Sequence, residues 1–425
     1  MTEPKFRVVT HPTGRQALWP AARTLPAGWT EALAATTKEA ALAHVTQQWT
    51  GFRPRRAASP ALTPATTGQT TSAPRRKTVD FSLMFFGSDE GHAASEKYEM
   101  VISAAKFADQ NGFSALWVPE RHFTRMGSLY PNPAVLQAAV ARETKRLKLR
   151  SASVVLPLHN PIRIVEEWSC VDNLSHGRIE ISFAPGWNPG DFLFYPERYA
   201  DRYDITYKGL DHIRSLWAGE MVDAVDGEGK AIRVRTYPTP VQKDLTIWMT
   251  CAGSERSFQA AGKHGCHLLT HLFDQDVETL AKKIKLYREA RAAAGYDPAT
   301  GRVAVTLHTY LGDTLADVQK AVRGPYADYL RENMGLLEKL AASRGLAIDL
   351  KRLGADEMAM AIDWLFEKFL RKRSLMGTPD SCAELVEQLI EVDVQDIACL
   401  IDFGPSAQAI LDSLPLLGKL ADRFR

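Results

Sequence analysis

Hydrophobic and polar residues divide this chain into two segments that are separated by a stretch of different composition. Between Arg53 and Thr78 the residues are mainly Pro, Ala, Ser, Thr and Arg, and large apolar residues are almost absent. On either side of this stretch, apolar residues recur at the spacings of strands and helices. The pattern therefore predicts two folded domains joined by a flexible linker of about 25 residues.

The segment after the linker alternates between short apolar runs and longer amphipathic stretches. Eight runs have the character of strands, at residues 81–86, 115–118, 147–155, 179–183, 246–251, 267–270, 303–310 and 396–401. Helical spacing is found between them, for example at residues 95–111, 132–145, 162–174, 254–263 and 277–293. This alternation predicts an α/β fold, a (β/α)8 TIM barrel, with a doubly wound sheet as the structural alternative.

The segment before the linker is short and predicts a small α+β domain. Residues 6–9 and 16–19 resemble strands that flank a turn, and residues 37–49 have the cap and spacing of one helix. Three longer insertions are expected in the barrel, at residues 186–202, 219–242 and 346–376, and the second has the pattern of a polar hairpin.

The composition and net charge of the chain argue against some classes of function. The chain has 425 residues, 45% of them hydrophobic, and a formal net charge of +2, which disfavours a nucleic-acid partner. No amino-terminal signal and no long apolar run are present, so we expect a cytoplasmic protein without membrane spans. The five cysteines form no Cys-x-x-Cys pair and indicate reduced packing residues.

Candidate chemistry lies where the predicted barrel strands end, because barrel active sites are built there. After the second strand, Glu120 and His122 are candidates for proton transfer, and a structural ion-pair network with Arg121 is the alternative. The sequence His159-Asn160-Pro161 has the pattern of a helix cap followed by a first-turn proline. His271 and His308 have no paired carboxylate at metal-binding spacing, so no metal site is expected.

A possible phosphate site follows the fifth strand. Ala252, Gly253 and Ser254 lead directly into a predicted helix, whose free amide groups could hold a phosphate with the help of Arg256. An ordinary helix cap is the alternative. Because no strand is followed by G-x-G-x-x-G, a Rossmann site for FAD or NAD(P)H is disfavoured, and FMN is preferred.

The strand-end segments together carry a resemblance to a known family. The segments W-V-P-E-R-H-F, N-P-I-R-x-x-E-E-W, D-N-L-S-H-G-R, A-P-G-W and C-L-I-D-F-G occur in this order over residues 79–425. They resemble the bacterial-luciferase-like flavin monooxygenases, in particular those found with nonribosomal peptide and polyketide assembly lines. The resemblance implies that the protein uses O2 and reduced FMN supplied by a separate flavin reductase. Barrels of this family often pair, so a homodimer is a further expectation.

The same resemblance implies roles for residues around the cofactor. Cofactor contacts are expected from Ser153, Gly186, Trp187, Ala252, Gly253, Ser254 and Arg256. The substrate pocket is expected to include Phe85, Phe86 and Asn188, although aromatic residues here could instead fill the barrel.

The short first segment carries a second resemblance. Leu18-Trp19-Pro20, Pro26-Ala27-Gly28-Trp29 and Trp49-Thr50-Gly51-Phe52-Arg53-Pro54 are similar to the motifs of MbtH-like proteins, which bind adenylation domains of nonribosomal peptide synthetases. Ala17 and Gly51 depart from the usual Ser and Asp. The resemblance implies partner contacts at Leu18, Trp19, Pro20 and Trp29, with core packing of the tryptophans as the alternative.

Together, the segments predict an MbtH-like module at residues 1–56, a linker at 57–78 and a flavin monooxygenase at 79–425. We expect hydroxylation of an aminoacyl or peptidyl group on a peptidyl carrier protein. Oxidation of a free small molecule and a non-catalytic subunit of the synthetase are the alternatives.

Overall fold

The chain forms two compact units, Met1–Thr71 and Ser72–Arg425. The computed structural model describes residues 5–10, 16–22, 24–25, 28–37, 40, 78–87, 94–124, 127–273, 275–332, 366, 370 and 372–425. The predicted linker and nearly all of the predicted helix at 37–49 lie outside these residues. The domain boundaries at 56 and 78 therefore stay predictions.

The first unit contains a three-stranded antiparallel sheet. Its strands are β1 (Phe6–Thr10), β2 (Gln16–Pro20) and β3 (Thr30–Thr36), in the order β2-β1-β3. Val8 and Val9 are completely buried. Arg7, in the central strand, donates a hydrogen bond to Glu31 of β3 at 3.1 Å. Both strands predicted from the sequence are thus present, together with a third.

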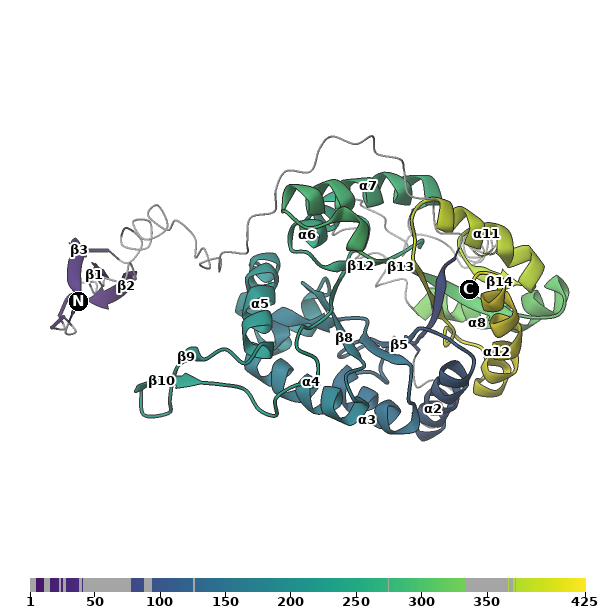
Figure 1. Ribbon diagram of the computed structural model, residues 1–425, viewed down its shortest axis with the longest axis horizontal. Coiled ribbons are helices and arrows are strands. Elements are labelled where there is room, and N and C mark those ends of the chain that lie inside the picture. The colour runs from purple at the N-terminus through teal and green to yellow at the C-terminus, as the bar shows by residue number, and fades with distance from the viewer. Residues whose placement is uncertain are drawn as a thin grey trace, which may run out of the picture. The chain divides into compact units, whose positions relative to one another are not determined.

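The second unit is a closed barrel of eight parallel strands, as the apolar runs predict (Figure 1). Each strand pairs with the next one along the chain, and the last pairs with the first. The strands are β4 (Asp80–Met84), β5 (Ala115–Val118), β6 (Lys148–Ser151), β8 (Ile179–Ala184), β11 (Ile247–Thr250), β12 (His267–His271), β13 (Val303–Leu311) and β15 (Asp396–Leu400). The doubly wound alternative is wrong, because an open sheet would leave two strands unpaired.

Helices surround this barrel (Figure 1). They are α2 (Ala94–Gln110), α3 (Pro133–Glu143), α4 (Pro161–Ser175), α5 (Arg202–Trp217), α6 (Glu255–Lys263), α7 (Val277–Ala293), α8 (Leu315–Glu332), α11 (Pro379–Glu391) and α12 (Ala407–Asp422). Local sequence sets several starts. The side chain of Asn160 accepts a hydrogen bond from the Ile162 amide and Pro161 begins α4, as the sequence predicts.

Short elements complete the loops that follow the strands. The predicted third strand is interrupted, and its end forms β7 (Val154–Val155) and the 3-10 helix η1 (Leu156–Leu158). The first insertion contains η2 (Pro189–Phe194) and η3 (Pro196–Arg198). The second is the expected hairpin, β9 (Val222–Val225) with β10 (Ala231–Val234). A fourth 3-10 helix is η4 (Pro298–Thr300).

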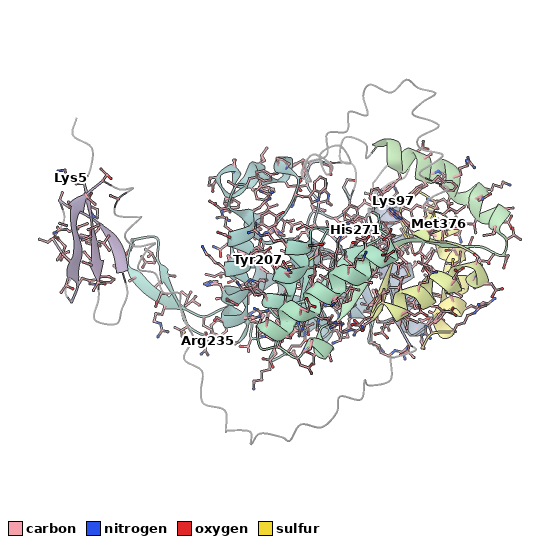
Figure 2. The ribbon with its side chains drawn as sticks, turned by 90° about the horizontal axis from the view of Figure 1, so that it is seen from above. Lys5, Lys97, Tyr207, Arg235, His271 and Met376 are labelled. Atoms are coloured by element: carbon pink, nitrogen blue, oxygen red, sulfur yellow. The ribbon has the colours of Figure 1, made fainter. Side chains whose placement is uncertain are left out.

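The third predicted insertion lies mostly outside the described residues. Its end forms β14 (Leu375–Gly377), which pairs with β13. Figure 2 labels Met376 in this strand. No helix in the described part of the chain is long and apolar enough to cross a membrane.

Near the amino-terminal ends of the strands, the barrel encloses the Arg150 cluster, which consists of Arg150, Glu180 and Asp396. Arg150 donates hydrogen bonds of 2.7 Å to each of the two carboxylates. Its guanidinium carbon lies 4.7 Å from the ring centre of Trp117 and 4.6 Å from that of Trp248. Burial disfavours charge, but the carboxylates outweigh it and raise the pKa of Arg150. This cluster closes the floor of the barrel.

Candidate active site

A cavity of about 250 Å³ lies above this floor, at the carboxyl ends of the strands. Met84, Thr250, His271 and Leu400 line it, and each is the last residue of its strand. Figure 2 labels His271 at the end of β12. Most of the lining is apolar. The position is the one at which barrel enzymes build their active sites.

Glu120, in the loop after β5, lies on the cavity wall and accepts three hydrogen bonds. Its Oε1 atom accepts hydrogen bonds from Nε2 of His122 at 2.8 Å and from Nε2 of His159 at 2.7 Å. Its Oε2 atom accepts one from the backbone amide of Val155 at 2.8 Å. We call Glu120, His122 and His159 the Glu120 cluster.

The pKa shifts in the Glu120 cluster favour an ionised carboxyl group on Glu120 and a protonated ring on His159. Burial alone would raise the pKa of Glu120, but the hydrogen bonds from the two histidines outweigh it and hold that pKa below its ordinary value. Burial would lower the pKa of His159, yet Glu120 raises it above the ordinary value. Glu120 is therefore a carboxylate at neutral pH, and the cationic form of His159 is stabilised.

Arg121 lines the cavity next to Glu120 and is 5% exposed. Its guanidinium contacts Asp191 of η2 at 3.4 Å, and its central carbon lies 5.2 Å from the Trp187 ring and 6.0 Å from the Phe86 ring. Burial raises the pKa of Asp191 in spite of Arg121. The distance of 3.4 Å is long for an ion pair, and the faces of the Trp187 and Phe86 rings help to balance the charge of Arg121.

Another part of the cavity wall is aromatic. His308 of β13 lines the cavity together with Phe273 and Tyr329, and the ring centres lie 6.4 Å and 5.5 Å from that of His308. Complete burial, with a further contribution from His271, lowers the pKa of His308 to about 3. His308 is therefore neutral at physiological pH. Arg121, by contrast, carries a positive charge.

The structure brings many of the predicted site residues together. Lining residues among them are Phe86, Glu120, Ser153, Gly186, Trp187 and Ala252. His122 is not on the cavity wall and is joined to it through Glu120. Of the alternative ion-pair network, the contact between Glu120 and His122 is present, whereas Arg121 pairs with Asp191 instead.

Two predicted pocket residues lie elsewhere. Phe85 is completely buried in the main apolar core, because neighbouring residues of an extended chain point to opposite sides and the cavity is lined by Met84 and Phe86. Asn188 is 2% exposed, caps η2 through the Gly190 amide and donates to Asp191 at 2.8 Å. Asn188 thus orients an acidic residue of the wall.

The predicted phosphate site lies at the rim. Ser254 accepts a hydrogen bond from the Ser257 amide and caps α6, so the cap interpretation is confirmed. Gly253 has φ of 115°, and Ser254 and Arg256 are exposed. Only Ala252 of this group lines the cavity. Phosphate binding by the rim stays a prediction.

Sequence reasoning missed three residues of the site: His159, Arg121 as a wall residue, and Asp191. His159 directly precedes the Asn160 cap of α4, so its pattern indicated only a helix start, and its contact with Glu120 lies 39 residues away in the sequence. Asp191 could not be paired with Arg121 from the sequence, because 70 residues separate them. No group of three or more metal-ligating side chains occurs within the described ranges.

In the first unit, Trp19 lies opposite Arg7 and donates a hydrogen bond to the Thr24 carbonyl oxygen at 3.1 Å. Leu18 and Pro20 lie opposite Val8 and Phe6. Trp29 precedes Thr30, which lies opposite Thr10. Both tryptophans are half-buried, and the register places them about four residues apart along the direction of β1. Docking at these residues stays a prediction.

Comparison with known proteins gives a match for each unit. Residues 78–396 match the family described as luciferase-like monooxygenase, and residues 2–61 match the MbtH-like proteins. The oxygenase component of flavin-dependent trigonelline monooxygenase from Acinetobacter baylyi is 25% identical over 320 residues, which cover 73% of this chain and 84% of that protein.

Two solved structures share the fold. A monooxygenase from Streptomyces bottropensis is 22% identical, with a TM-score of 0.65 over 81% of this chain and 99% of that chain. The oxygenating constituent of 3,6-diketocamphane monooxygenase from Pseudomonas putida, in complex with FMN, is 19% identical, with a TM-score of 0.65 over 82% and 99%. With three quarters of its residues matched, the chain belongs to the luciferase-like monooxygenase family and carries an MbtH-like domain at its amino-terminal end.

Proposed function

We propose that the barrel is a flavin-dependent monooxygenase that uses reduced FMN from a separate reductase and O2 to hydroxylate an aminoacyl or peptidyl group on a carrier protein. The observation that carries the proposal is the presence of an MbtH-like domain and a luciferase-like barrel in one chain. The MbtH-like domain would dock to an adenylation domain. A tether to the synthetase would raise the local concentration of the oxygenase near the carrier-bound substrate.

The cavity has the features that a flavin requires. A flat ring system needs an apolar slot into which the backbone can approach closely. At Gly186 an added Cβ atom would lie 2.7 Å from Val155 and 2.9 Å from Phe192, so only glycine leaves this wall open. Ser153, Trp187 and Ala252 would hold the ring, and the amino-terminal end of α6 would face the phosphate. When bound, reduced flavin supplies the two electrons that activate O2.

The side chains of the wall would do the remaining work. The apolar lining excludes water, which protects reactive species and strengthens electrostatic interactions. Arg121 would balance negative charge that develops in the cavity. Glu120 and His122 would hold or move a proton at Oε1 of Glu120, where their hydrogen bond lies.

A free small molecule is the second candidate substrate. It is favoured by the relative from Acinetobacter baylyi, whose name gives trigonelline as the compound that is oxygenated. The barrel chemistry would be the same, and the MbtH-like domain would then be unnecessary for turnover.

The test compares carrier-bound and free substrates with the full chain, FMN, a flavin reductase and NADH. Mass spectrometry of the loaded carrier protein should show a gain of one oxygen atom that depends on the chain and on O2. Oxygenation of the free amino acid alone would overturn the carrier proposal. Absence of FMN binding and of any oxygenation would overturn the monooxygenase proposal.

Docking is tested separately, by co-purification with an adenylation domain. Trp19→Ala should weaken the complex, because the indole is half-buried and available at the edge strand β2. Lys5→Ala, at an exposed position next to the same sheet, is the matched control (Figure 2). Equal co-purification of the two variants would contradict docking through Trp19.

A further inference from the structure

The Glu120 cluster joins two loops that are distant in sequence around one oxygen atom: Glu120 and His122 lie in one, and His159 lies 39 residues away in the other. Nε2 of His122 and Nε2 of His159 both lie within 2.8 Å of Oε1 of Glu120. Two imidazoles on one carboxylate oxygen exceed what a simple structural ion pair requires. The second oxygen is held by the Val155 amide, so the carboxylate is fixed in place.

The three side chains of the Glu120 cluster differ in their exposure to solvent. The side chain of Glu120 is 1% exposed and lines the cavity, whereas that of His159 is 32% exposed. His122 is 13% exposed and is covered by Phe194, whose ring centre lies 5.2 Å away. His159 is therefore the member of the cluster with the largest access to water.

Monooxygenation needs such access because the overall reaction consumes protons. Substrate C–H, O2, two electrons and two protons give C–OH and one water molecule. The electrons would come from the reduced flavin of the proposed function, which in its anionic form also brings one of the two protons, so one proton is taken up from solvent in each turnover. Most of the lining of the cavity is apolar, so the ionisable side chains of its wall are the groups suited to carry this proton.

We propose that His159 and Glu120 form a proton relay between solvent and the cavity, a role that rests on the proposed function. A proton taken up at Nδ1 makes the His159 ring a cation, and its Nε2 proton passes to Oε1 of Glu120. The neutral carboxyl group then releases this proton into the cavity. The ring regains its starting tautomer by exchange with water.

The charges around His159 fit this role. Glu120 raises its pKa, Glu167 of α4 adds to the effect, and burial and Arg198 of η3 oppose it. Arg198 donates a hydrogen bond to the backbone oxygen of His159 at 3.2 Å, which fixes the loop. His159 thus remains a proton donor at neutral pH, while Glu120 remains an acceptor.

The first test is chemical rescue in the full chain with FMN and a reductase. His159→Ala should reduce kcat by about 10²-fold, in the range of general acid–base effects, and added imidazole should restore at least a tenth of it. His212→Ala, at an exposed position on α5, is the matched control and should behave like the wild type. Unchanged kcat, or a loss that imidazole does not restore, would overturn the relay.

The second test needs no cofactor. Histidine side-chain NMR of the full chain should show His159 titrating above the ordinary value for histidine, with its resonance assigned from His159→Gln. In Glu120→Gln the titration midpoint should fall. An ordinary midpoint that Glu120→Gln leaves unchanged would overturn the relay.

The two tests distinguish the relay from the proposed function. Wild-type turnover together with an unaffected His159→Ala variant would contradict the relay alone. If the wild type neither binds FMN nor oxygenates, the proposed function fails and the relay fails with it.

Discussion

Two of the buried groups of charges in the barrel, the Arg150 cluster and the Glu120 cluster, differ in their composition and in their access to water. In the Arg150 cluster, one cation lies 2.7 Å from each of two carboxylates and between two tryptophan rings. In the Glu120 cluster, one carboxylate is shared by two titratable rings, of which one is a third exposed. The first group is almost completely shielded from water, whereas the second reaches the surface through His159.

Position along the strands explains the difference. Glu180 and Asp396 lie at the starts of their strands, where the barrel closes on itself. Glu120 lies just after the end of β5, where loops form the cavity. Charges at the closed end contribute to stability, and charges at the open end are free to serve function.

The largest expected effect is on the stability of the floor. Arg150→Met should destabilise the fold by about 3–5 kcal/mol, because Glu180 and Asp396 would stay buried without their cation. Urea unfolding gives the measurement. Arg163→Ala, which breaks only exposed pairs on α4, should cost under about 1 kcal/mol. Similar costs for the two variants would remove the distinction between floor and surface.

The second largest expected effect is a loss of kcat when a residue at the cavity end of the barrel is changed. His122→Gln should lower kcat by about 10²–10⁴-fold if His122 takes part in proton transfer with Glu120. Its unfolding free energy should stay within about 1 kcal/mol of the wild type, because His122 is partly exposed. Steady-state kinetics and urea unfolding check the two expectations. A stable variant with wild-type kcat would assign His122 a purely structural role.

A smaller effect is expected at the cavity wall. Gly186→Ala should cost about 1–3 kcal/mol, because φ is 78° and the new methyl group would meet Val155 and Phe192. FMN affinity should fall with it. Gly229→Ala is the matched control, because φ is 81° and nothing lies within 4 Å of the added carbon. Equal effects would show that backbone conformation alone decides, with no role for the crowded wall.

The smallest expected effect is a change with pH in the stability that the charge of Glu120 contributes. The folded pKa of Glu120 is lowered, so its charge stabilises the fold at pH values above the unfolded pKa of about 4.3, and this contribution is lost as the pH falls through the folded value. The stability difference between wild type and Glu120→Gln should therefore be largest near neutral pH and shrink on acidification. Urea unfolding at several pH values measures it. A difference that grows on acidification would contradict this sign.

Local signals account for much of what could be predicted. The Asn160-Pro161 start of α4 and the Ser254 cap of α6 follow from chemistry between near neighbours in the chain. The hairpin of β9 and β10 follows from its polar, turn-rich sequence. Prediction failed for Phe85, because the last residues of a strand alternate between core and cavity and the sequence does not fix that phase.

The sequence by itself determined the alternation of strands and helices, the family of each unit and the segments that carry polar side chains to the strand ends. These depend on spacing and local capping, which are properties of neighbouring residues. Tertiary structure alone decided that His159 meets Glu120 across 39 residues and that Asp191 meets Arg121 across 70. Barrel closure brings such loops together, and the distance between them is a property of the complete ring of strands.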